Sequence, residues 1–259
     1  MRKLRGKVKR MQILRILGVL LAAAAAIAAA YWLFLALSCL FIDKSREYEH
    51  PSKFYYALLN SGYTFLYKAA RARVHTSGLD KIPTERRFLI VSNHLSNFDN
   101  MIQSPLMKGV EVAYISKPEN FRIPIGGRFI KRSCYMAIER DNLRSSLVTI
   151  KHAAALMRDN IINVGVYPEG RRGKSYDLQP FHPGCLDAAI WAKAPVVVAT
   201  VTGTENIHKN FPFRHTDVHF DVIAVIETQG RRAAELSEEI RHIMQTHLDT
   251  YKTERTAQA

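Results

Sequence analysis

Two catalytic signatures and a disulfide framework are missing from this chain of 259 residues. Without the motif Gly-x-Ser-x-Gly, a covalent serine mechanism has little support. The P-loop spacing Gly-x4-Gly-Lys-Ser/Thr is also absent. Cys39, Cys134 and Cys185 are too few and too far apart for a disulfide framework or a close-spaced zinc motif. We therefore expect reduced thiols, which suit a domain that faces the cytoplasm, and no bound metal.

Acidic residues are absent before Asp43, whereas basic residues are frequent there. The formal net charge of the chain is +14, and half of this excess lies at the N-terminus, at Arg2, Lys3, Arg5, Lys7, Lys9, Arg10 and Arg15. A basic surface of this size favours polyanions such as phospholipid headgroups, nucleic acid or phosphorylated substrates. Charge alone does not choose among them.

Residues 16–42 form an uncharged apolar run that is long enough to cross a bilayer as a helix. A transmembrane or re-entrant helix is the preferred interpretation, because the run is longer than the apolar core of a signal peptide. A cleaved signal peptide and a buried helix of a soluble domain remain alternatives.

A second stretch, residues 54–67, places aromatic and aliphatic residues at helical spacing between flanking cations. This pattern describes an interfacial helix or a core helix equally well. We predict that residues 1–72 form a basic tail and N-terminal membrane-anchoring helices, and that residues 73–259 form an α/β domain. A shallow two-helix hairpin would keep both sides of the anchor at the cytoplasmic face of the cell membrane.

Beyond Thr76, short β-rich runs alternate with helical stretches, which indicates an α/β fold with a central, largely parallel sheet flanked by helices. The expected strands are residues 88–92, 112–116, 135–138, 162–167, 196–201 and 218–226. The expected helices are residues 99–108, 118–131, 143–159, 184–193 and 231–252.

The segment that follows the first of these strands carries a histidine and an aspartate, His94 and Asp99. Ligands bind at the carboxyl ends of strands in open α/β sheets. An imidazole oriented by a carboxylate can accept a proton from a hydroxyl. The alternative is that Asn97 or Asp99 only caps a helix.

Cations follow several other expected strands. The run Tyr167-Pro168-Glu169-Gly170-Arg171-Arg172-Gly173-Lys174-Ser175 suits an anion site, because guanidinium groups match phosphate geometry. Its alternative is a basic surface turn. Lys117 and Arg140 each follow another strand, so these cations would gather at one edge of the sheet.

These motifs, in this order and spacing, resemble the glycerolipid acyltransferase family, and specifically its 1-acylglycerol-3-phosphate acyltransferases. The first block, Asn-His-x-Ser-x-x-Asp, matches residues 93–99, and the third, Phe-Pro-Glu-Gly-Thr-Arg-Ser, matches residues 167–173. The second block ends at Ile138-Glu139-Arg140, and the fourth matches Ala194-Pro195-Val196-Val197.

The resemblance implies that His94 is the general base and that Asp99 orients it. It further implies that Lys117, Arg140 and Arg172 hold the phosphate of the acceptor. The residues implied to shape the substrate pocket are Ser96, Glu169, Gly170, Arg171 and Pro195. The third block departs from the family at Tyr167, Arg171 and Gly173, and an additional cation at Arg171 bears on the choice of headgroup.

The reaction so implied moves a fatty acyl group from acyl-CoA or acyl carrier protein to the sn-2 hydroxyl of a lysophosphatidate. It needs no cofactor beyond the thioester co-substrate, and no nucleic-acid partner is expected. Three alternatives stay open: the same transfer to another lysolipid or glycolipid, a membrane-tethered phosphate- or nucleic-acid-binding module without catalysis, and a metal-dependent hydrolase that uses His94 and Asp99 as ligands.

Overall fold

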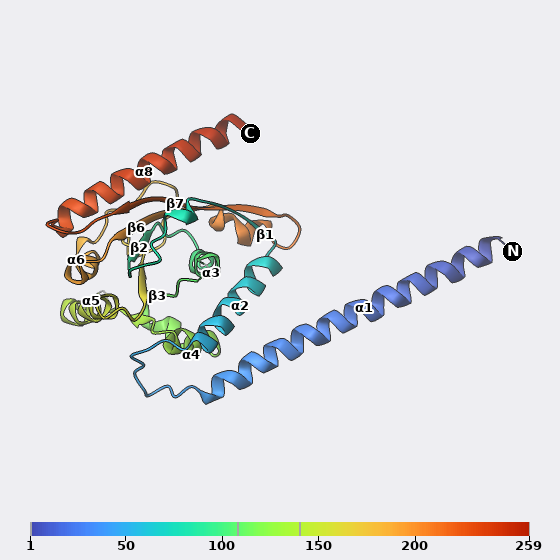
Figure 1. Cartoon of the computed structure of the whole chain (residues 1–259). Helices are drawn as coiled ribbons and strands as arrows, with labels where there is room; N and C mark the ends of the chain where they lie inside the picture. Colours follow the sequence, from blue (N-terminus) through green and yellow to red (C-terminus); the bar gives the residue numbers. More distant parts are fainter. Residues whose placement is uncertain (1, 108, 140, 259) are drawn as a thin grey trace. The chain divides into compact units, whose positions relative to one another are not determined.

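The structure, a computed structural model, describes residues 2–107, 109–139 and 141–258, and its contacts divide the chain into two compact units, Met1–Ser45 and Arg46–Ala259. The first unit is mainly the long helix α1, Arg2–Ser38 (Figure 1). Its alanine-rich middle has high helix propensity. The segment Lys9–Phe41 is long and apolar enough to cross a membrane, judged by length and composition alone. A signal sequence or a core helix can meet the same criteria.

The larger unit alternates strands with helices along the chain. Its strands are β1 (Ala72–Ser77), β2 (Leu89–Ser92), β3 (Val112–Ser116), β4 (Met136–Ala137), β5 (Asn163–Val166), β6 (Val196–Thr202) and β7 (Thr216–Ile226). Its α-helices are α2 (Lys53–Ala69), α3 (Phe98–Leu106), α4 (Gly126–Arg132), α5 (Leu143–Arg158), α6 (Asp187–Ala192), α7 (Ile207–Asn210) and α8 (Ala233–Gln258).

The strands form one seven-stranded sheet in the order β1-β7-β6-β2-β5-β3-β4. Every neighbouring pair is parallel except β6 and β7, which are antiparallel. The prediction of a largely parallel sheet is therefore confirmed. Central strands such as β2, β5 and β6 are buried along their whole length, as expected for a sheet covered on both faces.

Helices cover both faces of this sheet (Figure 1). On one side lie α5, α6 and α8, and α8 inserts Leu236, Ile240 and Met244 at helical spacing into the core. On the other side, α2 and α3 pack together, and Tyr67 of α2 and Ile102 of α3 join a buried cluster with Val201 of β6. Helix α2 is thus a core helix of the larger unit, which is one of the two alternatives that its sequence pattern allowed. The contact-based boundary at Ser45 also precedes the predicted boundary at residue 72.

The helix predicted over residues 118–131 is interrupted. A short 3-10 helix, Pro118–Arg122, is followed by extended backbone at Ile123, and α4 begins only at Gly126. Pro124 explains the break, because a proline disfavours the helical conformation of the residue before it. The strand β1 was not predicted at all. Within it only Ala72 and Val74 are partly buried and the other residues are exposed, as is usual at the edge of a sheet.

Candidate active site

The site lies at the carboxyl ends of β2, β5 and β3, which are neighbours in the sheet and run parallel. His94 follows β2, Tyr167 follows β5 and Lys117 follows β3. Parallel strands end at the same edge of a sheet, so the fold brings together three chain segments that are far apart in the sequence. The predicted gathering of these segments is confirmed by the topology.

His94 and Asp99 are in direct contact. The imidazole Nδ1 lies 2.7 Å from Asp99 Oδ2, and the carboxylate is fully buried. The same oxygen accepts hydrogen bonds from the backbone N–H groups of Leu95 (2.7 Å) and Ser96 (2.8 Å). Asn97, by contrast, makes no side-chain cap on α3. Asp99 therefore does more than cap the start of a helix: it holds the loop and the imidazole ring together.

Thr204 supplies the remaining contact of Asp99, and the sequence analysis missed it. Its hydroxyl donates to Asp99 Oδ1 at 2.5 Å, and the side chain is completely buried. Thr204 follows the end of β6, which pairs with β2 in parallel. The signal in the sequence was its place just after an expected strand, but a lone threonine there carries no motif. The carboxylate is thus held on both oxygens.

Asn93 is a second residue whose role the sequence analysis missed. Its side-chain amide donates to the carbonyl of Val201 at 2.8 Å and accepts from the N–H of Val201 at 2.7 Å. Through these two bonds the side chain of Asn93 extends the pairing of β2 with β6 beyond Ser92, the last paired residue of β2. Asn93 thereby fixes the backbone on which His94 stands.

The ring of His94 packs face to face against the ring of Tyr167, with centroids 4.3 Å apart and planes 16° apart. Because Nδ1 bonds to Asp99, Nε2 is the ring nitrogen left for a substrate; no described residue bonds to it. About a fifth of the side chain of His94 is exposed. An oriented imidazole with one accessible nitrogen is the arrangement that a general base requires.

Glu169 connects the His94 loop to the loop after β5. Its Oε1 accepts the N–H of His94 at 3.1 Å, and its Oε2 accepts the N–H of Gln179 at 3.0 Å. Burial raises the pKa of this carboxyl above its ordinary value, although the two N–H donors oppose the shift. The backbone N–H of Gly173 also donates to the carbonyl of His94 at 2.7 Å. The loop after β5 is therefore hydrogen-bonded to both the backbone N–H and the backbone carbonyl of His94.

Gly170 turns the chain between these attachments. It has φ of +68°, a conformation that side chains with a Cβ rarely adopt, and its N–H donates to the carbonyl of Tyr167. Beside it, the Arg171 guanidinium donates to Gln179 Oε1 at 2.6 Å. An open pocket of about 380 Å³ is lined here by Glu169, Gly170, Arg171, Gln179, Pro180 and His182.

The predicted phosphate ligands are exposed cations. Arg172 precedes the Gly173 that bonds to His94, and Lys117 follows β3; within the described ranges neither side chain has a hydrogen bond or ion pair. The predicted ligand Arg140 lies outside the described residues. Ser96 is in the site, where its backbone binds Asp99 and its hydroxyl accepts the N–H of Phe98 at 3.2 Å.

Pro195 is not in the site. It precedes β6, and its carbonyl accepts the N–H of Leu89 at the start of β2. Because β2 and β6 are parallel, Pro195 lies at the amino edge of the sheet and His94 lies beyond the carboxyl edge. The prediction that Pro195 lines the substrate pocket is wrong, since its sequence block marks the beginning of a strand rather than its end.

The described part of the chain contains no group of three or more histidine, cysteine, aspartate and glutamate side chains that could hold a metal ion. The site described above combines a buried carboxylate, an oriented imidazole and nearby exposed cations.

Known proteins resemble this chain in sequence and in fold. The acyltransferase family model matches residues 73–202, half of the chain. The 1-acyl-sn-glycerol-3-phosphate acyltransferase of Limnanthes douglasii is 25% identical over 131 residues, which are 51% of this chain and 46% of that protein. The enzyme of the same name from Escherichia coli strain K12 is 27% identical over 118 residues, 46% of this chain and 48% of its own. The chain thus spans about half the length of these relatives.

A solved structure shares the fold. It is the crystal structure of the 1-acyl-sn-glycerophosphate (LPA) acyltransferase, PlsC, from Thermotoga maritima, with a TM-score of 0.65 and 21% identity. The match covers 86% of this chain and 88% of that one. The match of the family model across β1 to β6, where the site is built, shows that this chain belongs to the acyltransferase family.

Proposed function

We propose that this protein transfers a fatty acyl group from an acyl thioester to the sn-2 hydroxyl of 1-acyl-glycerol-3-phosphate, which makes phosphatidate. The observation that carries the proposal is the contact of His94 Nδ1 with the buried Asp99, because it leaves Nε2 for a substrate hydroxyl. Family membership supplies the reaction type, and the relatives named for this acyl transfer supply the acceptor.

The reaction begins when His94 Nε2 takes the proton of the acceptor hydroxyl as its oxygen attacks the thioester carbonyl. The tetrahedral intermediate then collapses, the carbon–sulfur bond breaks, and the imidazolium returns the proton to the leaving thiolate. Asp99 stabilises the imidazolium in between, because its carboxylate faces Nδ1 at 2.7 Å. A positioned base of this kind typically contributes about 10² to 10⁴ in rate.

The acceptor phosphate would be held by Lys117, Arg140 and Arg172. The attachment of Gly173 to the carbonyl of His94 supports a role for Arg172, since it fixes the neighbouring residue beside the base. A dianionic phosphate that meets two or three cations gains strong, charge-assisted hydrogen bonds. These bonds would place the glycerol hydroxyl against Nε2.

The donor would be acyl-CoA or acyl carrier protein, and no further cofactor is required for this chemistry. Since such thioesters are cytoplasmic, we place the catalytic unit at the cytoplasmic face of the cell membrane. The apolar segment Lys9–Phe41 supports membrane attachment by its length and composition.

A second acceptor class is favoured by Arg171. Its guanidinium is tied to Gln179 and lines the pocket beside Glu169, so an additional cation faces space where a different headgroup could bind. The candidate is the same acyl transfer to another lysolipid or to a glycolipid.

Product analysis by mass spectrometry over a panel of lysolipids tests both candidates. The full-length protein is incubated with acyl-CoA or acyl carrier protein and each acceptor in turn. Thioester-dependent phosphatidate is the expected main product, and we expect His94→Gln to lower its rate about 10³-fold. An unchanged rate in His94→Gln would contradict the mechanism, and a preferred acceptor other than lysophosphatidate would select the second candidate.

A further inference from the structure

The connection between β6 and β7 exposes two phenylalanines. After Thr204, the short helix α7 leads into Phe211-Pro212-Phe213, where the side chains of Phe211 and Phe213 are 53% and 88% exposed. Aromatic side chains of this size usually lie in a core or an interface. Two of them exposed in one loop are typical of a surface that meets an apolar environment outside the chain.

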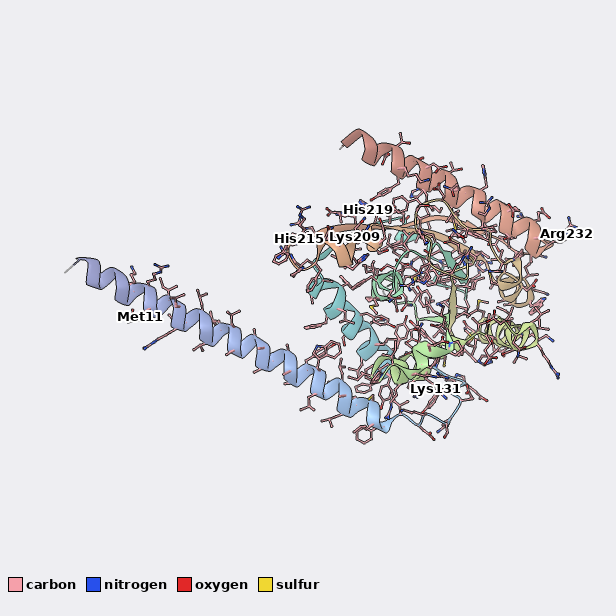
Figure 2. The ribbon with its side chains drawn as sticks, turned by 180° about the vertical axis from the view of Figure 1, so that it is seen from behind. Met11, Lys131, Lys209, His215, His219 and Arg232 are labelled. Carbon is pink, nitrogen blue, oxygen red and sulfur yellow. The ribbon has the colours of Figure 1, made fainter. Side chains whose placement is uncertain are left out.

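Cations surround these rings. Lys209 and Arg214 are exposed in the same connection, and the side chains of Lys209 and His215 lie together on one flank of the unit (Figure 2). Arg71, between α2 and β1, contacts His215, with 2.8 Å between its guanidinium and the ring Nε2. We call Lys209, Phe211, Phe213, Arg214 and Arg71 the aromatic-basic patch.

Negative charge is absent from residues 206–216 of this connection. The acids at its two ends are occupied: Glu205 accepts hydrogen bonds from Tyr176 and Asn206, and Asp217 pairs with His75. The patch thus combines apolar rings with a positive rim, which is the composition of surfaces that enter the headgroup region of anionic membranes.

The loop is held in shape by its own backbone. The N–H groups of Phe211 and Arg214 donate to the carbonyls of Ile207 and Asn210, at 3.0 and 2.8 Å. Ile207 is buried in the core cluster with Ile102 and Val201. The two rings are therefore presented by a fixed support, so little ordering is needed when they meet a surface.

The patch and the catalytic centre belong to the same connection. Thr204 binds Asp99 at the beginning of this segment, and Phe211 follows seven residues later. Both emerge from the carboxyl edge of β6, the edge at which His94 stands. A lipid acceptor must reach His94 from a bilayer, and a membrane contact here would turn this edge toward it.

We propose that the aromatic-basic patch inserts Phe211 and Phe213 into the headgroup region of an anionic bilayer and so presents the carboxyl edge of the sheet to lipid-embedded acceptor. The inference rests on the proposed lipid acyl transfer. It commits to a membrane surface as the occupant, because the charge of the rim and the apolar rings match that surface together.

The first test places a polarity-sensitive fluorophore on Phe213→Cys in the full-length protein, reconstituted in phosphatidylglycerol vesicles. The matched control is Val225→Cys, an exposed site near the other end of β7, about 30 Å along the strand. The background signal is measured on labelled protein that carries only its native cysteines. We expect a blue shift and quenching by brominated lipid at Phe213→Cys and neither at Val225→Cys. Equal, water-like signals at both sites would overturn the proposal.

The second test separates this inference from the proposed function. Phe211→Ser/Phe213→Ser is assayed on vesicle-embedded acceptor and on a short-chain lysophosphatidate that dissolves as monomers. We expect about a tenfold loss on vesicles or more, with turnover of the soluble acceptor unchanged. Absence of soluble turnover in the wild-type protein would reject the proposed function, whereas unchanged vesicle turnover in the variant would reject only the patch.

Charge is tested by Lys209→Gln/Arg214→Gln. On phosphatidylglycerol vesicles we expect about a tenfold loss or more, and on phosphatidylcholine vesicles little change, because each cation near an anionic surface adds to binding. The rival occupant is acyl carrier protein, which would be recognised by its acidic surface. Suppose that this variant lost turnover of the soluble acceptor with acyl carrier protein as donor but kept its vesicle activity with acyl-CoA as donor. The patch would then be assigned to acyl carrier protein.

Discussion

The His94–Asp99 pair and the basic turn after β5 are expected to serve the same reaction, yet they are built in opposite ways. Asp99 is completely buried, and both of its oxygens are hydrogen-bonded. Arg171 and Arg172 are exposed, and only Arg171 has a side-chain partner among the described residues. In the proposed mechanism, the groups that move the proton are thus fixed before substrate binds, whereas the phosphate site is completed by the substrate itself.

This difference has a physical basis. A buried carboxylate without partners would be very unfavourable, so the chain supplies its hydrogen bonds from two segments, the loop at residues 94–96 and Thr204. An exposed guanidinium is solvated and needs no partner until a phosphate replaces water. Substitutions in the first region should therefore reduce the chemical step, and those in the second should mainly weaken acceptor binding.

The largest effect is expected from Asp99→Asn. An amide in this place still fills the volume and accepts hydrogen bonds, but it cannot stabilise an imidazolium as a carboxylate does. We predict a fall of about 10² to 10³ in kcat with little change in the acceptor KM, measured with lysophosphatidate in detergent micelles. Circular dichroism and thermal melting check that the fold persists. A rise in KM with kcat unchanged would remove the distinction between the two regions.

The next effect is expected from Arg172→Ala. Loss of one charge-assisted phosphate contact should lower kcat/KM for lysophosphatidate by about 10 to 100, mostly through the acceptor KM. The donor KM should stay within about twofold, because the donor does not use this contact. Arg171→Ala is the matched control at the adjacent position, and we expect a smaller loss there. Equal increases of both KM values in Arg172→Ala would argue against a phosphate role.

The contact between His94 and Asp99 was the part of the candidate site that the sequence predicted best. His94 and Asp99 are separated by only five positions, so a loop that enters a helix brings them together without help from distant segments. The alternation of strands and helices likewise predicted the parallel sheet, and with it the shared edge for His94, Lys117 and Tyr167.

Contacts made across the sheet could not be predicted in this way. Thr204 reaches Asp99 only because β6 lies beside β2, and the local sequence pattern does not determine the order of strands in a sheet. The misplacement of Pro195 has a different origin: its role was carried over from the family resemblance, although the expected strand at residues 196–201 already put Pro195 at the amino end of a strand. Strand β1 was not predicted because an exposed edge strand lacks the alternation of apolar and polar residues that marks a half-buried strand.

Glu169→Gln tests whether the connection between the two regions matters. A glutamine can accept from one N–H group, either that of His94 or that of Gln179, but presents its own N–H₂ to the other. We predict about a tenfold fall in kcat/KM, because the loop that carries Arg172 would move relative to the base. The raised pKa of Glu169, caused by burial, means that its ionised form is disfavoured on folding.

The sign of this shift gives a second readout for the same variant. A carboxyl whose folded pKa is raised contributes most to stability when it is protonated, and this contribution is lost as pH rises through the folded pKa. Wild-type protein should therefore lose some thermal stability as the pH rises from about 4 through the folded pKa of Glu169, and Glu169→Gln should lose less. Parallel melting curves for both proteins over this range would show that Glu169 does not contribute.

The smallest effect is expected from Thr204→Val, which keeps the shape of the side chain and removes one donor to Asp99. Oδ2 still accepts hydrogen bonds from the backbone of Leu95 and Ser96 and from the ring of His94, so the carboxylate stays in place. The buried Oδ1, however, loses its hydrogen-bond donor. We predict a kcat lower by about three- to tenfold with an unchanged acceptor KM. Thr204→Ser should restore the wild-type rate, because it returns the hydroxyl. A purely structural role predicts the reverse pattern: a lower melting temperature in Thr204→Val at full kcat per folded molecule. The predicted pattern would instead make Thr204 a positioning residue for Asp99, since the loss then follows the carboxylate rather than the fold.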